Sequence, residues 1–181
     1  EELDALVLRL RGPGGCPWDQ EQTHESLKSC LLEETYEVFE AIDNQNNTEL
    51  LEELGDLLLQ PLMHAAVSEV FDTNQVTNQV IDKLIRRHPH VFGETQVRNS
   101  EEVLQNWNAI KSNEYAHRKS VLDGIPKHLP ALYRALKISK KAVKQGFEWP
   151  DYEGVLDKIQ EELSELKEAK TQEEKSSELG D

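Results

Sequence analysis

Apolar residues recur every three or four positions along most of the chain, which is the spacing of a helix that buries one face. No stretch alternates apolar and polar residues convincingly enough to indicate a strand. The pattern therefore predicts an all-α fold. The expected helices cover about 3–11, 23–42, 48 to beyond 59, 74–88, 101–118, 130–145, 152–169 and 172–181.

Glycine, proline and short polar residues mark where these helices should end. Gly12–Gly15 contains three glycines and a proline, so it should end the first helix. Asp43–Asn47 is a turn by composition, because its side chains compete for backbone hydrogen bonds. Thr48 is the expected N-cap of the helix that follows. Pro61 lies inside that helix and should kink it or end it locally, since proline has no N–H.

An internal repeat organises the chain. The segment 33–41, which begins Glu-Glu-x-x-Glu, recurs at 161–169, and Glu-Leu-Gly-Asp at 53–56 recurs at 178–181. We interpret this as a duplicated helical hairpin. The expected domains are a first copy at 1–120, a helical connection at 121–150 and the start of a second copy at 151–181. Because the second copy breaks off where the first continues, we expect the chain to be part of a longer protein.

Charge and composition restrict the class of protein. Acidic residues outnumber basic ones 35 to 20, for a net charge of −15, which argues against a nucleic-acid-binding protein that needs a basic face. No run approaches the roughly 20 apolar residues of a membrane span. The two cysteines do not form a disulfide framework. We therefore expect a cytoplasmic protein with neither nucleic acid nor membrane as partner.

Carboxylates at helical spacing provide the main candidate chemistry. Glu34 and Glu37 are three residues apart, as are Glu53 and Asp56, so each pair shares a helix face. Both pairs lie about eight residues from the turn near 44–46, so an antiparallel hairpin brings them level. Hard oxygen ligands of this kind suit Mg²⁺ or Mn²⁺. A solvated acidic face is the alternative, but it gives no reason for the same spacing to recur in the second copy.

Basic and aromatic residues on two other predicted helices are candidates for substrate binding. Lys83, Arg86 and Arg87 form a KxxRR pattern whose cations suit phosphate oxygens. Trp107 and Lys111 are four apart, so an indole could lie under a base with an ammonium near phosphate. An ordinary basic turn before the helix stop and a buried core tryptophan remain the alternatives.

Taken together, EExxE, fifteen residues and ExxD resemble the signature of the MazG family of nucleoside triphosphate pyrophosphohydrolases. GGCPWDQEQTHESL, ELLEELGDLLLQ, KLIRRHPHVFG and LDGIPKHLPALYRALKISKKA also resemble two-domain members, and the match spans essentially the whole chain. The resemblance implies an all-α helical bundle completed by homodimerisation. It further implies Mg²⁺-dependent hydrolysis of nucleoside triphosphates to monophosphate and pyrophosphate.

The resemblance also assigns site residues. Those implied as metal ligands are Glu34, Glu37, Glu53 and Asp56 in the first copy and Glu162, Glu165, Glu178 and Asp181 in the second. Glu33 supports the first set, and either Glu33 or Glu34 is the candidate to accept a proton from the attacking water. The KxxRR and WxxxK residues are implied to line the nucleotide site.

One position separates the two copies. Lys158 stands four residues before Glu162, where the family resemblance implies a substrate-binding lysine, but the matching residue of the first copy is Cys30. We therefore expect the first copy to be the weaker one, and a longer protein to hydrolyse nucleotides better than residues 1–181.

Two other functions remain open. The chain, and the first copy above all, is alternatively a non-catalytic dimerisation or regulatory module. A di-iron bundle would use Glu-x-x-His pairs, which Glu21 with His24 and Glu114 with His117 formally match.

Overall fold

The computed structural model describes residues 2–180, and their regular elements are all α-helices, so the all-α prediction is confirmed. The chain divides into two compact units, Glu1–Ser112 and Asn113–Asp181. The helices are α1 (Glu2–Arg11), α2 (Pro17–Glu21), α3 (Leu27–Asp43), α4 (Asn47–Val67), α5 (Thr73–Arg87), α6 (Pro89–Phe92), α7 (Ser100–Glu114), α8 (Ala131–Val143), α9 (Tyr152–Glu168) and α10 (Gln172–Glu178).

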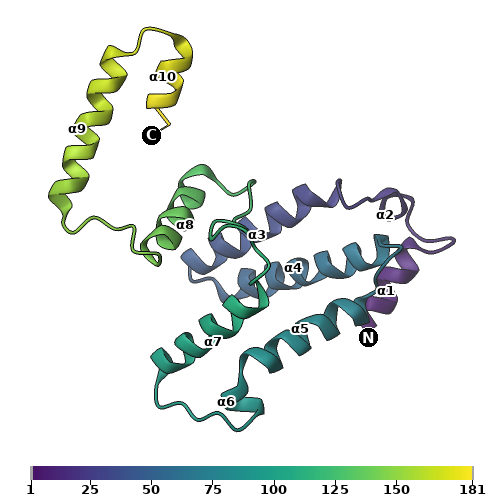
Figure 1. Ribbon diagram of the computed structural model, residues 1–181. Helices are drawn as coiled ribbons and strands as arrows, with labels where there is room; N and C mark the ends of the chain where they lie inside the picture. Colours follow the sequence, from purple (N-terminus) through teal and green to yellow (C-terminus); the bar gives the residue numbers. More distant parts are fainter. Residues whose placement is uncertain (1, 181) are drawn as a thin grey trace. The chain divides into compact units, whose positions relative to one another are not determined.

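The first unit is built on an antiparallel hairpin of α3 and α4, which lie side by side (Figure 1). Its turn has Gln45 in the left-handed region at φ 54°. Asn46, rather than the expected Thr48, is the N-cap of α4, because its side chain accepts hydrogen bonds from the N–H groups of Thr48 and Glu49. The hairpin fixes how the faces of α3 and α4 meet.

A small apolar core holds α1 against this hairpin. Val7 of α1, Leu27 of α3 and Met63 of α4 are buried together. Leu59, Leu62, Ala66 and Val67 pack around them. Burial of these side chains is the main force that orients the three helices.

Pro61 does not end its helix, which continues to Val67. Of the two expected effects of Pro61, the local end was wrong, and the kink stays a prediction. Proline removes one backbone hydrogen bond at this point, but nearby residues of the helix are buried: Gln60 is 5% exposed and Met63 4%. Packing against the core therefore keeps the helix continuous.

The second unit contains α8, α9 and α10. Asp151 caps α9 through a hydrogen bond to the N–H of Gly154, and Thr171 and Glu174 form a capping box at the start of α10. The packed pair of α9 and α10 matches α3 and α4 in sequence. The repeat-based domain boundaries at 120 and 150 stay a prediction.

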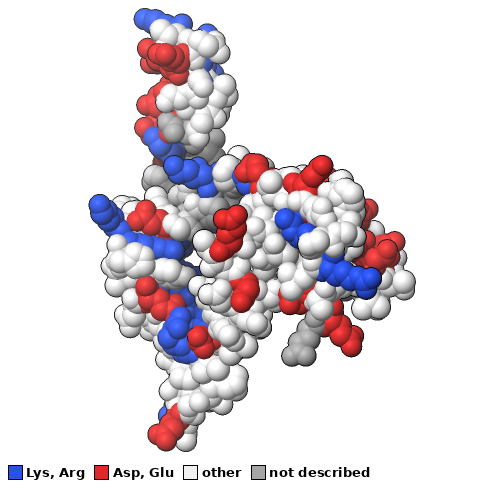
Figure 2. Space-filling model, turned by 90° about the vertical axis from the view of Figure 1, so that its right-hand side faces the viewer, with Lys and Arg blue, Asp and Glu red and all other residues white. Residues whose placement is uncertain are grey.

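Charged residues of both signs are interspersed over the face that Figure 2 shows, with uncharged surface between them. Among residues 2–180, no helix is both long and apolar enough to cross a bilayer.

Candidate metal centres and their surroundings

The hairpin of α3 and α4 brings three carboxylates together. Glu34 and Glu37 come from α3 and Glu53 from α4, and one oxygen of each lies within 4.8 Å of the others. These residues of α3 and α4 lie about two helical turns from the turn that connects the helices, so the antiparallel arrangement places them level with one another. The sequence-based expectation that these groups converge therefore agrees with the geometry.

The electrostatics of this first cluster favour a cation. Burial raises the pKa of Glu34 above its ordinary value of 4.5, and the charges of Asp56, Glu37 and Glu53 raise it further. The pKa of Glu53 is also raised, first by burial and then by the neighbouring carboxylates. A divalent ion between these oxygens would relieve both effects.

Two residues expected at the first cluster lie at its margin. Asp56 is exposed and outside the three-residue group described above, although its charge acts on Glu34. Glu33 is exposed, and among the described residues it belongs to no group of metal-ligating side chains.

The second copy reproduces the arrangement. Glu162 and Glu165 of α9 and Glu178 of α10 form another group with oxygens within 4.8 Å of one another. Asp181, the fourth predicted ligand, lies outside the described residues. Lys158 contacts this cluster, with its Nζ 2.7 Å from Oε1 of Glu162.

A pocket of about 350 Å³ adjoins the second cluster. Lys158, Glu162 and Glu178 line it on the polar side, and Trp149 contributes an aromatic wall. Trp149 can lie there because residue 154 is glycine: a Cβ at that position would come 2.7 Å from its ring. The other lining residues are Val155, Ile159, Leu163, Leu166 and Leu179.

The predicted nucleotide-binding cations are partly assembled in the first unit. The Arg87 guanidinium, on a residue only 9% exposed, lies 5.3 Å from the centre of the Trp107 ring. The Lys111 ammonium lies 4.6 Å from the same ring. Trp107 is thus a platform for two cations. Lys83 is half-buried on α5 and Arg86 is exposed there.

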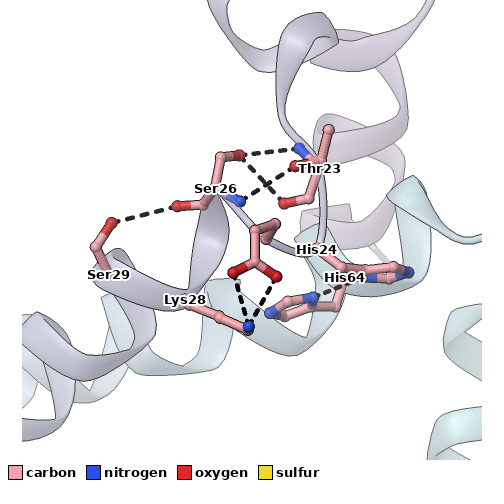
Figure 3. Close-up of polar contacts among 7 residues, drawn as sticks. Thr23, His24, Ser26, Lys28, Ser29 and His64 are labelled. Carbon is pink, nitrogen blue, oxygen red and sulfur yellow. Dashed lines mark hydrogen bonds and ion pairs between the residues drawn. The ribbon is translucent and has the colours of Figure 1, made fainter.

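Sequence reasoning missed a histidine pair at the start of α3. The Nδ1 atoms of His24 and His64 lie 2.9 Å apart, and the rings are stacked (Figure 3). The one available signal is that His64 follows Glu53 by eleven residues, three turns along one face of α4. The partner, His24, lies in the turn before α3, and only the folded chain brings it there.

The donor chemistry of both clusters fits a hard divalent cation. All donors are carboxylate oxygens held on rigid helices. One of them, Oε2 of Glu162, is buried and has no hydrogen-bond partner in the protein. Neither His24 nor His117 belongs to such a group among residues 2–180, which gives the di-iron alternative no support. The fold and clusters thus define an all-α protein with two acidic centres.

Comparison with known proteins identifies the family. The MazG nucleotide pyrophosphohydrolase domain matches residues 22–92. A Thermotoga maritima protein named nucleoside triphosphate pyrophosphohydrolase/pyrophosphatase MazG is 46% identical over all of this chain and 71% of its own length. An Escherichia coli nucleoside triphosphate pyrophosphohydrolase is 45% identical over 92% of the chain and 65% of its own length. The chain belongs to the MazG family, and it spans about two thirds of these two relatives.

Proposed function

We propose that the protein hydrolyses nucleoside triphosphates to the monophosphate and pyrophosphate with Mg²⁺, or Mn²⁺, as cofactor. The observation that carries the proposal is the recurrence of the same carboxylate group in both copies of a MazG-family chain. The names of the relatives support this substrate class.

In this proposal the clusters hold the metal. Glu34, Glu37 and Glu53 supply oxygens in the first copy, and Glu162, Glu165 and Glu178 in the second. Asp56 and Asp181 complete the two sets. When bound, the metal would polarise the triphosphate and the attacking water.

The proton of that water needs an acceptor. Glu34 is one candidate, because a carboxylate can hold the metal through one oxygen and accept a proton on the other. Glu33, exposed beside it, is the second candidate.

Cationic side chains would bind the phosphate oxygens. Arg87 and Lys111 are held together over Trp107, so they form a preorganised pair. Lys83 and Arg86 lie on the same helix as Arg87. Lys158 would bind phosphate oxygens in the second copy.

The remaining proposals concern assembly and location. We propose a homodimer, because several large apolar side chains of α3 and α4 are half or more exposed in the single chain. They are Leu32, Tyr36, Phe39, Ile42, Leu51 and Leu58. We also propose a cytoplasmic location, where nucleoside triphosphates are held and where Cys16 and Cys30 would remain free thiols.

Pyrophosphate release tests the proposed function. The chain should release pyrophosphate from nucleoside triphosphates with Mg²⁺ and not with EDTA. Glu37→Gln and Glu165→Gln each remove one carboxylate. Each should therefore abolish the pyrophosphate release that its own copy contributes. The rate of pyrophosphate release should fall more than about 100-fold in the double variant, since mutation of residues that only support metal ligands already lowers metal affinity or activity 10–100-fold.

Glu40→Gln is the matched control, because Glu40 is an exposed glutamate of α3 outside the cluster. Its rate should equal that of the unmodified chain. Nucleotide binding without any pyrophosphate release would contradict the proposal and identify a non-catalytic module instead.

A further inference from the structure

The two carboxylate clusters have glutamates at matching positions, but the residue one helical turn before these glutamates differs between the copies. Lys158 precedes Glu161 and Glu162 by three and four residues, and Cys30 precedes Glu33 and Glu34 by the same spacing. Positions three and four apart lie on one face of a helix. The residue at this position therefore decides which group lies against the cluster.

In the second copy that group is an ammonium. Lys158 Nζ lies 2.7 Å from Oε1 of Glu162 and 2.9 Å from Oε1 of Glu161. The Glu162 side chain is only 17% exposed and that of Lys158 44%. This ion pair is therefore better shielded from water than an ordinary surface pair.

In the first copy no such charge comes from the matching position. Cys30 is a half-buried thiol. The neighbouring lysine of α3, Lys28, pairs with Glu25 at 2.7 Å and not with the cluster.

We propose that Lys158 is a resident counter-ion of the second cluster, which repels a divalent cation and must move away from Glu162 for tight metal binding. The ammonium contacts Oε1 of Glu162 while Oε2 has no hydrogen-bond partner in the protein, so a divalent cation on this carboxylate would lie beside a like charge and compete with it. The matching position of the first cluster is Cys30, which supplies no ammonium. The second cluster therefore binds free metal more weakly than its glutamates alone would allow.

This inference rests on the metal binding in the proposed function, and it gives the two copies different behaviour. The first cluster takes up metal directly. The second takes it up together with a change of partner for Lys158, which lies at the edge of the Trp149 pocket. Metal binding at the second cluster is thus linked to any anion that can pair with the Lys158 ammonium once it has left Glu162.

Mn²⁺ titration of the full 181-residue chain, followed by the electron paramagnetic resonance signal of free Mn²⁺, tests the inference without nucleotide. With the first cluster disabled by Glu37→Gln, Lys158→Met should tighten Mn²⁺ binding about three- to tenfold, the range expected for losing one partly shielded ion pair. Lys158→Arg keeps the charge and should leave the affinity within about twofold of that of the same chain with Lys158.

The reciprocal variant introduces a lysine at the matching position of the first cluster. With the second cluster disabled by Glu165→Gln, Cys30→Lys should weaken Mn²⁺ binding by a similar factor, and the matched Cys30→Met should not. A merely structural role for Lys158 predicts no effect of Cys30→Lys.

The inference is overturned if Lys158→Met leaves the affinity unchanged, if Cys30→Lys has no effect, or if the second cluster binds no Mn²⁺ in any variant. These outcomes are separate from a failure of the proposed function, which is the absence of metal-dependent pyrophosphate release.

Discussion

The carboxyl groups of Glu34 and Glu53 show how one residue's surroundings direct its chemistry. Both are partly buried, and both face other carboxylates, so their pKa values are raised in the folded chain. A carboxyl of this kind stabilises the fold most when protonated, below its ordinary pKa. That contribution is lost as pH rises through the raised value.

Glu34→Gln imitates the protonated form and should therefore stabilise the metal-free protein at pH 7. We expect the midpoint of thermal unfolding in EDTA to rise by about 1–2 °C, as for relief of like-charge pairs on a helix. The gain should vanish near pH 4, where Glu34 itself is protonated. A lower midpoint at pH 7 would show that the cluster is not repulsive. Glu40→Gln is again the control.

His64 gives the opposite pH dependence. Burial, and secondarily the charge of His24, lowers the pKa of His64 below its ordinary value of 6.5. The folded chain thus prefers the neutral ring. Its stabilising contribution is present above about pH 6.5 and is lost as pH falls through the lowered value, because the unfolded chain takes up the proton first.

His64→Gln should reduce the fall in thermal stability between pH 7 and pH 5, measured by circular dichroism. His128→Gln is the matched control, since His128 is exposed in the second unit. An unchanged pH profile for His64→Gln would show that the stacked pair does not titrate as described.

At the scale of helices, the apolar period found the long helices but not their ends. It placed the start of α3 at Thr23, whereas the helix begins at Leu27. Thr23 and Ser26 instead exchange hydrogen bonds between side chain and backbone, a local competition that periodicity does not record. The short helices α2 and α6 were missed because neither contains a full amphipathic repeat.

Asn46 is the cap on which the hairpin depends, because α4 starts there and carries Glu53. Asn46→Ala should destabilise the protein by about 1 kcal/mol, or a fall of about 2–4 °C in the unfolding midpoint. The neighbouring Asn47→Ala should change it by less than about 0.5 kcal/mol, as an ordinary surface substitution does. Equal effects of the two variants would contradict this role for Asn46.

The candidate site was foreseeable to the extent that it repeats. Spacing selected the two glutamates that α3 or α9 contributes to each cluster, because positions three apart share a helix face. The third glutamate of each cluster was selected because an antiparallel hairpin brings its position level with that pair. Spacing did not predict that Asp56 lies outside the first group. It also did not predict that two cations lie over the Trp107 ring. Those positions depend on side-chain packing between helices that are distant in sequence.

At the scale of the whole molecule, one chain carries two acidic centres, one in each unit. Their glutamates match, while Cys30 and Lys158 make their charges differ. The duplication therefore provides two versions of one acidic centre rather than two identical ones.

The most direct test of a shared metal centre is anomalous X-ray diffraction from crystals soaked in Mn²⁺. We expect a manganese peak bonded to oxygens of Glu34, Glu37 and Glu53, at the distances typical of carboxylate ligands. Density without such a peak at saturating Mn²⁺, with these side chains turned apart into solvent, would contradict it.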